Sequence, residues 1–337
     1  MLGEDRQVGS VEKLIHLRRA PIVGSLRPEL LSMLAEALRP RTLREGEALF
    51  VEGELVGAAE FLVVGRLHLE RGGRTVGQAE AGTALGEIGV VARAPALVTA
   101  TAETDALTLE LVADACLDLI DDHFGILRHY LREVCGRIID DWQRSPRGTP
   151  HVIREARQPG EADLRDLDLV ERIFQIRRQP LFRRASINAL ADLSRTVSEV
   201  HLDEGDHLWA EDEPARYVML VLAGEARGRS RAGLELLAGP GWPLGAVEAI
   251  AGRPRWYEAQ VTRPLVALTA EIEVLFDVFE DNPDLALSFL SAIGRMSLQL
   301  SAELADAAGE PGEERSALDV SRIGPAAEPQ GVPPTPA

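Results

Sequence analysis

The chain has 337 residues, of which 45% are hydrophobic and 27% charged, and its formal net charge is −18. This composition is typical of a soluble globular protein with room for two ordinary domains, and the acidic excess disfavours nucleic acid and anionic membranes as partners. Cys116 and Cys135 are too few for a disulfide framework. No apolar run approaches the ~20 residues of a transmembrane helix, and the polar N-terminal segment does not resemble a secretory signal. We therefore expect a cytoplasmic protein.

The first half of the chain predicts helices followed by short strands. A short helix ends near Pro21, and an amphipathic helix at 27–38 places its leucines on one face. Strands broken by glycine follow, with Gly72 and Gly73 expected at the tip of a hairpin. After one more strand at 97–112, a long helical pattern closes this half.

The second half repeats the first at a constant shift of 159 positions. The segment EKLIHLRRAPIVG from Glu12 aligns with ERIFQIRRQPLFR from Glu171, and REGEALFVEG from Arg44 aligns with DEGDHLWAED from Asp203. Two copies of one domain explain this periodicity. The predicted organisation is a domain at 11–142, a linker at 143–167, a second domain at 168–304 and a disordered Pro/Ala-rich tail at 305–337.

Short strands at regular spacing, capped by helices, favour one fold class. We expect a mainly β protein with flanking α-helices, built as two jelly-roll-like antiparallel β-barrels in tandem. The closing helix of the first copy, which has a broad apolar face, could also support a homodimer.

One loop in each copy combines groups that suit a sugar phosphate. The loops read GEIGVVARAPALVTATA at 86–102 and GAVEAIAGRPRWYEAQV at 245–261. In each loop a short helix follows the glycine, and the N-terminus of this helix leaves backbone N–H groups free for a phosphate. An arginine after the proline would match phosphate oxygens two at a time, and a carboxylate near the helix start can accept hydrogen bonds from a ribose.

Both copies resemble cyclic-nucleotide-binding domains, the β-roll modules of catabolite-activator-type regulators and of protein kinase A regulatory subunits, which carry two in tandem. The family's phosphate-binding cassette opens with Gly-Glu and continues with Pro-Arg and small residues. In the first copy Glu87 keeps the ribose acid, but Ala96 and Leu97 replace the arginine and the small residue. The second copy keeps Arg255 but has Ala246 at the acid position and Trp256 at the small one. The resemblance implies ligand contacts from Gly86, Glu87, Ile88, Thr99, Gly245, Ala246, Arg255 and Trp256.

Two functions stay open at this point. The first is a non-catalytic regulatory protein that senses cAMP, cGMP or a related anionic ligand and relays occupancy through its C-terminal helices. The alternative is a ligand-free adaptor that uses degenerate β-rolls for protein contacts. Side chains of Leu97 and Trp256 that face into their pockets would favour the adaptor, and outward ones would favour binding.

Other motifs predict little chemistry. The seven histidines show no metal-ligand spacing, and no nucleophile–base–acid set can be assembled. We therefore expect no metal, no cofactor and no enzymatic activity, and a protein partner in its place. No recognition helix follows either copy, which disfavours DNA binding. Ser186, in the kinase-like motif RRASI, is interpreted as a helix cap.

Overall fold

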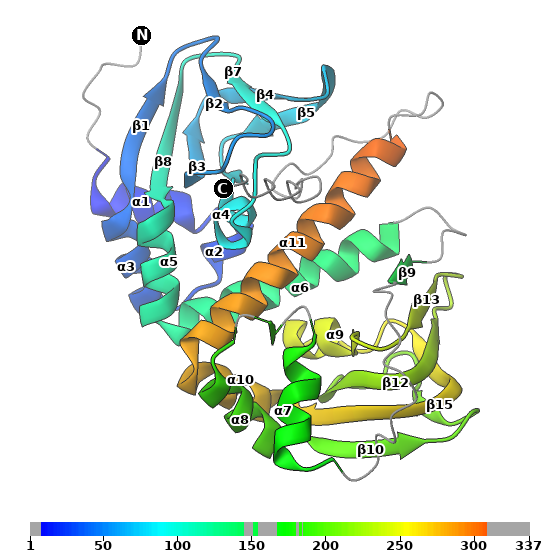
Figure 1. The fold of residues 1–337 in the computed structure, drawn as a ribbon. Helices are drawn as coiled ribbons and strands as arrows, with labels where there is room; N and C mark the ends of the chain where they lie inside the picture. Colours follow the sequence, from blue (N-terminus) through cyan, green and yellow to red (C-terminus); the bar gives the residue numbers. More distant parts are fainter. Residues whose placement is uncertain (1–7, 145–150, 154–166, 180–181, 184, 309–337) are drawn as a thin grey trace, which may run out of the picture.

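The computed structural model describes residues 8–144, 151–153, 167–179, 182–183 and 185–308. The predicted tail beyond residue 308 and most of the predicted linker lie outside these described residues. Figure 1 shows two β-rich domains with two long helices crossing between them.

The first domain opens with three helices, whose bounds follow the sequence signals. Proline occupies the first turn of the second and third of them, where its missing N–H costs nothing. The three helices are α1 (Ser10–Leu17), α2 (Pro21–Gly24) and α3 (Pro28–Ala37).

Eight strands and three further helices complete this domain. The eight strands form two four-stranded antiparallel sheets, ordered β1-β8-β3-β6 and β2-β7-β4-β5. The hairpin predicted at Gly72 and Gly73 joins β4 to β5. The strands are β1 (Arg39–Leu43), β2 (Ala48–Phe50), β3 (Ala58–Val64), β4 (Arg66–Arg71), β5 (Arg74–Glu80), β6 (Ala84–Leu85), β7 (Thr99–Ala102) and β8 (Ala106–Val112). The helices are α4 (Glu87–Ala92), α5 (Ala113–Asp122) and α6 (Phe124–Arg144).

The second domain repeats this order with one continuous sheet, β10-β15-β12-β13-β9, to which β11 and β14 add at the sides. Strand β9 (His151–Ile153) falls inside the predicted linker and runs parallel to β13. The remaining strands are β10 (Ser198–Leu202), β11 (His207–Trp209), β12 (Tyr217–Arg229), β13 (Glu235–Ala238), β14 (Pro243–Leu244) and β15 (Glu258–Glu271). The helices are α7 (Leu169–Arg177), α8 (Ile187–Thr196), α9 (Ala246–Ala251), α10 (Ile272–Asp281) and α11 (Pro283–Ala308).

The 159-position repeat is reproduced by the helices of the described structure. Helices α3, α4 and α5 and their counterparts α8, α9 and α10 start and end at equivalent residues. Gly86 and Gly245, which precede α4 and α9, share a left-handed backbone with φ of 77° and 74°. The predicted fold class, antiparallel jelly-roll-like sheets with flanking helices in tandem, is confirmed. The sheets are open rather than closed into barrels.

The closing helical segment differs from the single helix that its apolar pattern predicts. His123 and Asn282 leave the helical region, with φ of −131° and −134°, and each divides the segment in two. This break turns α6 and α11 away from their own sheets, as Figure 1 shows. The Ser186 cap is confirmed, because its hydroxyl accepts a hydrogen bond from the Ala189 N–H at 3.2 Å.

Helix α11 contains a long apolar stretch. Contrary to the sequence expectation, the stretch Pro283–Ala305 is long and apolar enough to cross a membrane by length and composition. Within the protein, however, 61% of its most apolar window is buried, which is the behaviour of a core helix.

A buried acid in β3 makes the stability depend on pH. Glu60 is fully buried and accepts a hydrogen bond from Arg41 at 3.0 Å, and burial raises its pKa from 4.5 to about 7. The folded state therefore holds the proton of Glu60 more tightly than the unfolded state does. The free energy of unfolding falls by about 3 kcal/mol as the pH rises from 4.5 to about 7. We expect Glu60→Gln to reduce this loss, which is measured by comparing the free energy of unfolding in urea below pH 4.5 and above pH 7. Parallel pH profiles for the wild type and the variant would contradict this expectation.

Candidate functional site

The first cassette is held by a glycine that no other residue could replace without strain. Gly86 has φ 77°, and a Cβ at this position would lie 2.8 Å from the Ala58 carbonyl oxygen. It directs the chain into α4, whose Ile88 is buried against Leu298 of α11. Thr99 at the far side of the loop accepts a hydrogen bond from the Glu52 N–H at 3.0 Å. Gly86, Glu87 and Ile88 line one pocket, and Thr99 is not among its lining residues.

The ribose acid of the first cassette is engaged by the protein itself. Arg137 of α6 donates a hydrogen bond from Nη1 to Glu87 Oε1 at 2.8 Å, and both side chains are nearly inaccessible. Such a buried, charge-assisted pair is strongly held, because separating it would strand a charge in a low-dielectric interior. A ribose hydroxyl would have to compete with Arg137 for the same carboxylate.

The phosphate side of this pocket is filled by apolar side chains. Leu97 is 5% exposed and joins a cluster with roll residues such as Leu67 and Leu69 and with Ala302 of α11. The space left between Glu87, Leu97 and Leu298 is about 40 Å³ for the centres of water-sized molecules. Ligand pockets for drug-sized molecules are about ten times larger. Leu97 therefore faces inward.

In the second cassette the phosphate arginine is turned into the domain. Arg255 is fully buried and donates hydrogen bonds to the Gly245 and Tyr217 carbonyl oxygens, both at 2.7 Å. Its guanidinium stacks 4.0 Å from the centroid of the Trp209 ring. A Cβ at Gly245 would collide with this guanidinium, so the glycine is required here as well.

A second acid replaces the missing one in this cassette. Glu248 of α9 is 1% exposed, and its Oε2 lies 3.7 Å from Arg255 Nη1. Burial raises the pKa of Glu248, and the charge of Arg255 opposes that rise. Ala246 is buried in the first turn of α9 and supplies no polar side chain.

Aromatic side chains close the second pocket. Trp256 is 9% exposed, and its ring lies 5.8 Å from that of Trp142 in α6 and 4.8 Å from that of Tyr257. Trp142 also packs against Trp242 at 6.4 Å. About 10 Å³ remains for water-sized molecules between these rings. Trp256 therefore faces inward, like Leu97.

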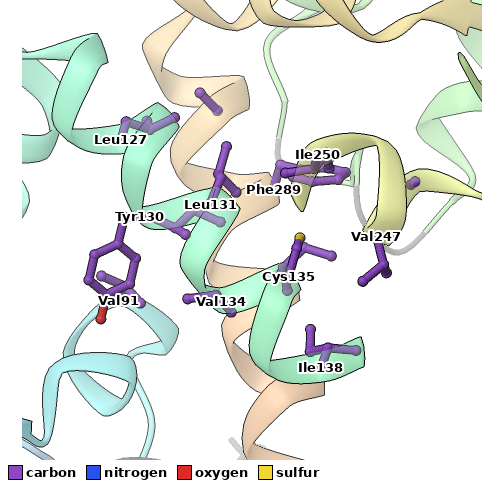
Figure 2. Packing of buried hydrophobic residues seen from close by; sticks show 14 of the residues in the cluster. Val91, Leu127, Tyr130, Leu131, Val134, Cys135, Ile138, Val247, Ile250 and Phe289 are labelled. Atoms are coloured by element: carbon purple, nitrogen blue, oxygen red, sulfur yellow. The ribbon is translucent and has the colours of Figure 1, made fainter. Parts of the chain in front are cut away.

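The two domains exchange their closing helices. Helix α6 of the first domain packs on α9, the cassette helix of the second, and α11 of the second packs on α4, the cassette helix of the first. Figure 2 shows Leu131 and Cys135 of α6 beside Val247 and Ile250 of α9, with Phe289 of α11 close by. Each pocket is therefore completed by a helix from the other domain.

Polar contacts fix this exchange. Arg253 donates to Asp140 at 2.6 Å across the α9–α6 contact. At the α11–α4 contact, Arg295 donates to the Ala92 carbonyl oxygen at 3.3 Å. A buried hydrogen bond of 3.2 Å joins Ser301 of α11 to Asp141 of α6.

Sequence reasoning named the residues of both cassettes but missed their internal partners. A signal for Arg137 exists, because this charge lies three residues after Val134 on the apolar face of α6. Glu248 carries a similar signal, since it stands where the first copy has Gly89 in the repeat. Among the described residues, no group of three or more His, Cys, Asp or Glu side chains could hold a metal ion.

The Glu87–Arg137 pair gives a direct expectation for stability. Arg137→Met keeps the length of the side chain but removes the cation that pairs with the buried Glu87. We expect a loss of about 3–5 kcal/mol in the free energy of unfolding, measured in urea. Glu87→Gln with Arg137→Met should recover part of this loss, because no acid is then stranded. A single variant as stable as the wild type would contradict the pairing.

Residues 40–123 match the family described as the cyclic nucleotide-binding domain. The matched residues lie in the first domain, and helices α3, α4 and α5 of that domain recur with equivalent bounds as α8, α9 and α10 of the second at the 159-position shift. No curated protein sequence matches the chain significantly.

Solved structures that resemble the chain include regulators of two kinds. The regulatory subunit of a cAMP-independent protein kinase A from Trypanosoma brucei is 15% identical, with a TM-score of 0.33, covering 84% of this chain and 95% of that one. The regulatory domain of Toxoplasma gondii protein kinase A, co-crystallised with cAMP, is 15% identical, with a TM-score of 0.34 and coverages of 86% and 97%. The N-terminal domain of a transcriptional regulator from Streptomyces coelicolor is 25% identical, with a TM-score of 0.35 and coverages of 42% and 99%.

Proposed function

We propose that the chain is a non-catalytic, cytoplasmic regulatory protein in which two cyclic-nucleotide-binding domains form one nucleotide-independent adaptor for a protein partner. The observation that carries this proposal is the internal engagement of both ligand residues. Arg137 pairs with the acid of the first cassette. The arginine of the second cassette donates hydrogen bonds to two backbone carbonyls and stacks on Trp209.

The energetics support this reading of the pockets. The first cassette lacks the phosphate arginine, which costs about 3–5 kcal/mol by analogy with a broken buried ion pair, or roughly two to three and a half powers of ten in affinity. In the second cassette, Arg255 would have to leave four contacts within the protein before it could reach a phosphate. Leu97 and Trp256 line pockets that leave only about 40 Å³ and 10 Å³ for the centres of water-sized molecules, far less than a ligand of nucleotide size occupies.

Nucleotide sensing is the second candidate function. It is favoured by the family match over residues 40–123 and by the retention of Glu87 in one cassette and Arg255 in the other. In this case a cyclic nucleotide would displace Leu97 or Trp256, and the exchanged helices α6 and α11 would relay the movement to the other domain.

Calorimetric titration with cAMP and cGMP separates the two candidates. The adaptor predicts no binding heat for the wild-type chain at millimolar nucleotide. The matched positive control is Ala96→Arg with Leu97→Ala, which restores the arginine and the small residue beside the existing Glu87. We expect this variant to bind at least about tenfold more tightly than the wild type. Saturable binding by the wild type would overturn the adaptor in favour of sensing.

A further inference from the structure

A second cavity lies in the first domain and shares only Glu87 with the pocket of the first cassette. It is enclosed by α2, α3, β3, β8, α5 and α6, and its wall is almost entirely apolar. The lining includes Phe61, Glu87, Leu111, Cys116, Ile120 and Tyr130. The cavity offers about 30 Å³ to the centres of water-sized molecules, and one water needs about 10–15 Å³ by this measure.

One polar group in this wall has no partner. Tyr130 of α6 is 5% exposed, and its hydroxyl has no hydrogen-bond partner among the described residues. Figure 2 shows the ring projecting from α6 toward Val91 of α4. Burial raises the pKa of Tyr130, with the nearby Glu87 charge as a further cause, so the hydroxyl stays protonated and available as a donor. Buried hydroxyls without a partner are rare in native proteins, because each is costly.

The second domain provides an internal comparison. At the 159-position shift, Val23, Ile120 and Tyr130 correspond to Phe182, Phe279 and Phe289. These three rings pack together, with centroids 6.3 Å apart for Phe182–Phe289 and 5.1 Å apart for Phe279–Phe289. The second domain therefore fills with phenyl rings the space that the first domain leaves open beside a hydroxyl.

We propose that the cavity of the first domain holds a small uncharged guest, either a pair of waters or a molecule of two or three heavy atoms, that accepts a hydrogen bond from the Tyr130 hydroxyl. Its size excludes a nucleotide, and benzene occupies an engineered cavity about five times larger. Glu87 lines this cavity, so the guest would contact the same residue that forms an ion pair with Arg137.

The effect of Tyr130→Phe on stability has opposite signs with and without a guest. If the guest is present, the variant loses a hydrogen bond, and the equilibrium constant of unfolding rises about fivefold. If the hydroxyl is unpartnered, its removal leaves this constant unchanged or lowers it, and the proposal fails. The matched control is Tyr217→Phe, which removes a hydroxyl that donates to the Leu208 carbonyl oxygen at 2.9 Å and calibrates the loss of one such bond.

Two further measurements keep the test independent of folding defects. Ile120→Phe copies the second domain and expels the guest, so Tyr130→Phe should no longer destabilise the chain in that background. In a high-resolution crystal structure of the wild type, separate peaks near the Tyr130 hydroxyl would identify waters, and continuous density would identify a larger guest. A cavity that is empty, or that takes up xenon under pressure without displacing any density, would overturn the proposal.

Discussion

Arg255→Met is expected to lower the free energy of unfolding by about 3–5 kcal/mol. The variant removes the cation that pairs with the buried Glu248 and leaves the Gly245 and Tyr217 carbonyl oxygens without their donors. It also removes the stacking on Trp209. Urea unfolding followed by tryptophan fluorescence measures the loss, because the Trp209 ring stacks on the guanidinium and Trp256 directly follows Arg255 in the sequence.

Arg253, two residues before Arg255, gives a matched control for this prediction. Arg253 forms an ion pair with Asp140, but its side chain is 44% exposed, and exposed pairs contribute about 0–1 kcal/mol. Arg253→Met should therefore cost far less than Arg255→Met. Glu248→Leu combined with Arg255→Met should recover part of the loss, since no acid is then left unpaired. Equal costs for the two arginines would contradict the structural role of Arg255.

Trp142→Ala is expected to cost about 3–5 kcal/mol and to weaken the second domain, although Trp142 belongs to the first. Its ring packs between Trp242 and Trp256 and is 6% exposed, and truncating a buried tryptophan removes both the transfer free energy and the packing around it. Hydrogen exchange should report the loss of protection in α9 and β14, which border this aromatic cluster.

The control for Trp142 is an aromatic residue with little burial. Phe174 of α7 is 62% exposed, so Phe174→Ala should change the free energy of unfolding by no more than about 0.5 kcal/mol. If Trp142→Ala changes protection only within the first domain, helix α6 does not support the second pocket, and the helix exchange is contradicted.

The fold could be predicted from the sequence because the repeat is visible without any tertiary information. The 159-position shift places Gly65, Gly82 and Gly86 on glycines and Pro95 on a proline. Residues that are equivalent by this shift form equivalent helices, α3 with α8, α4 with α9 and α5 with α10. Glu87 and Arg255 could likewise be identified by their places in the two loops. Their partners could not, because Arg137 lies 50 positions from Glu87 and becomes its neighbour only when α6 turns away at His123.

The exchange of the closing helices was also beyond sequence reasoning. The apolar spacing of α6 shows that one face of the helix is buried, but Leu131 and Cys135 would satisfy that pattern against any apolar surface. The direction in which Leu97 and Trp256 face depends in the same way on the helices that cover them, through Ala302 and Trp142.

Scanning calorimetry of the full chain tests the helix exchange most directly. Because each cassette helix is covered by a helix from the other domain, we expect a single unfolding transition whose calorimetric and van't Hoff enthalpies agree. Arg253→Met and Trp142→Ala should both shift this one transition without dividing it. Two resolved transitions in the wild type, one for each domain, would contradict the account.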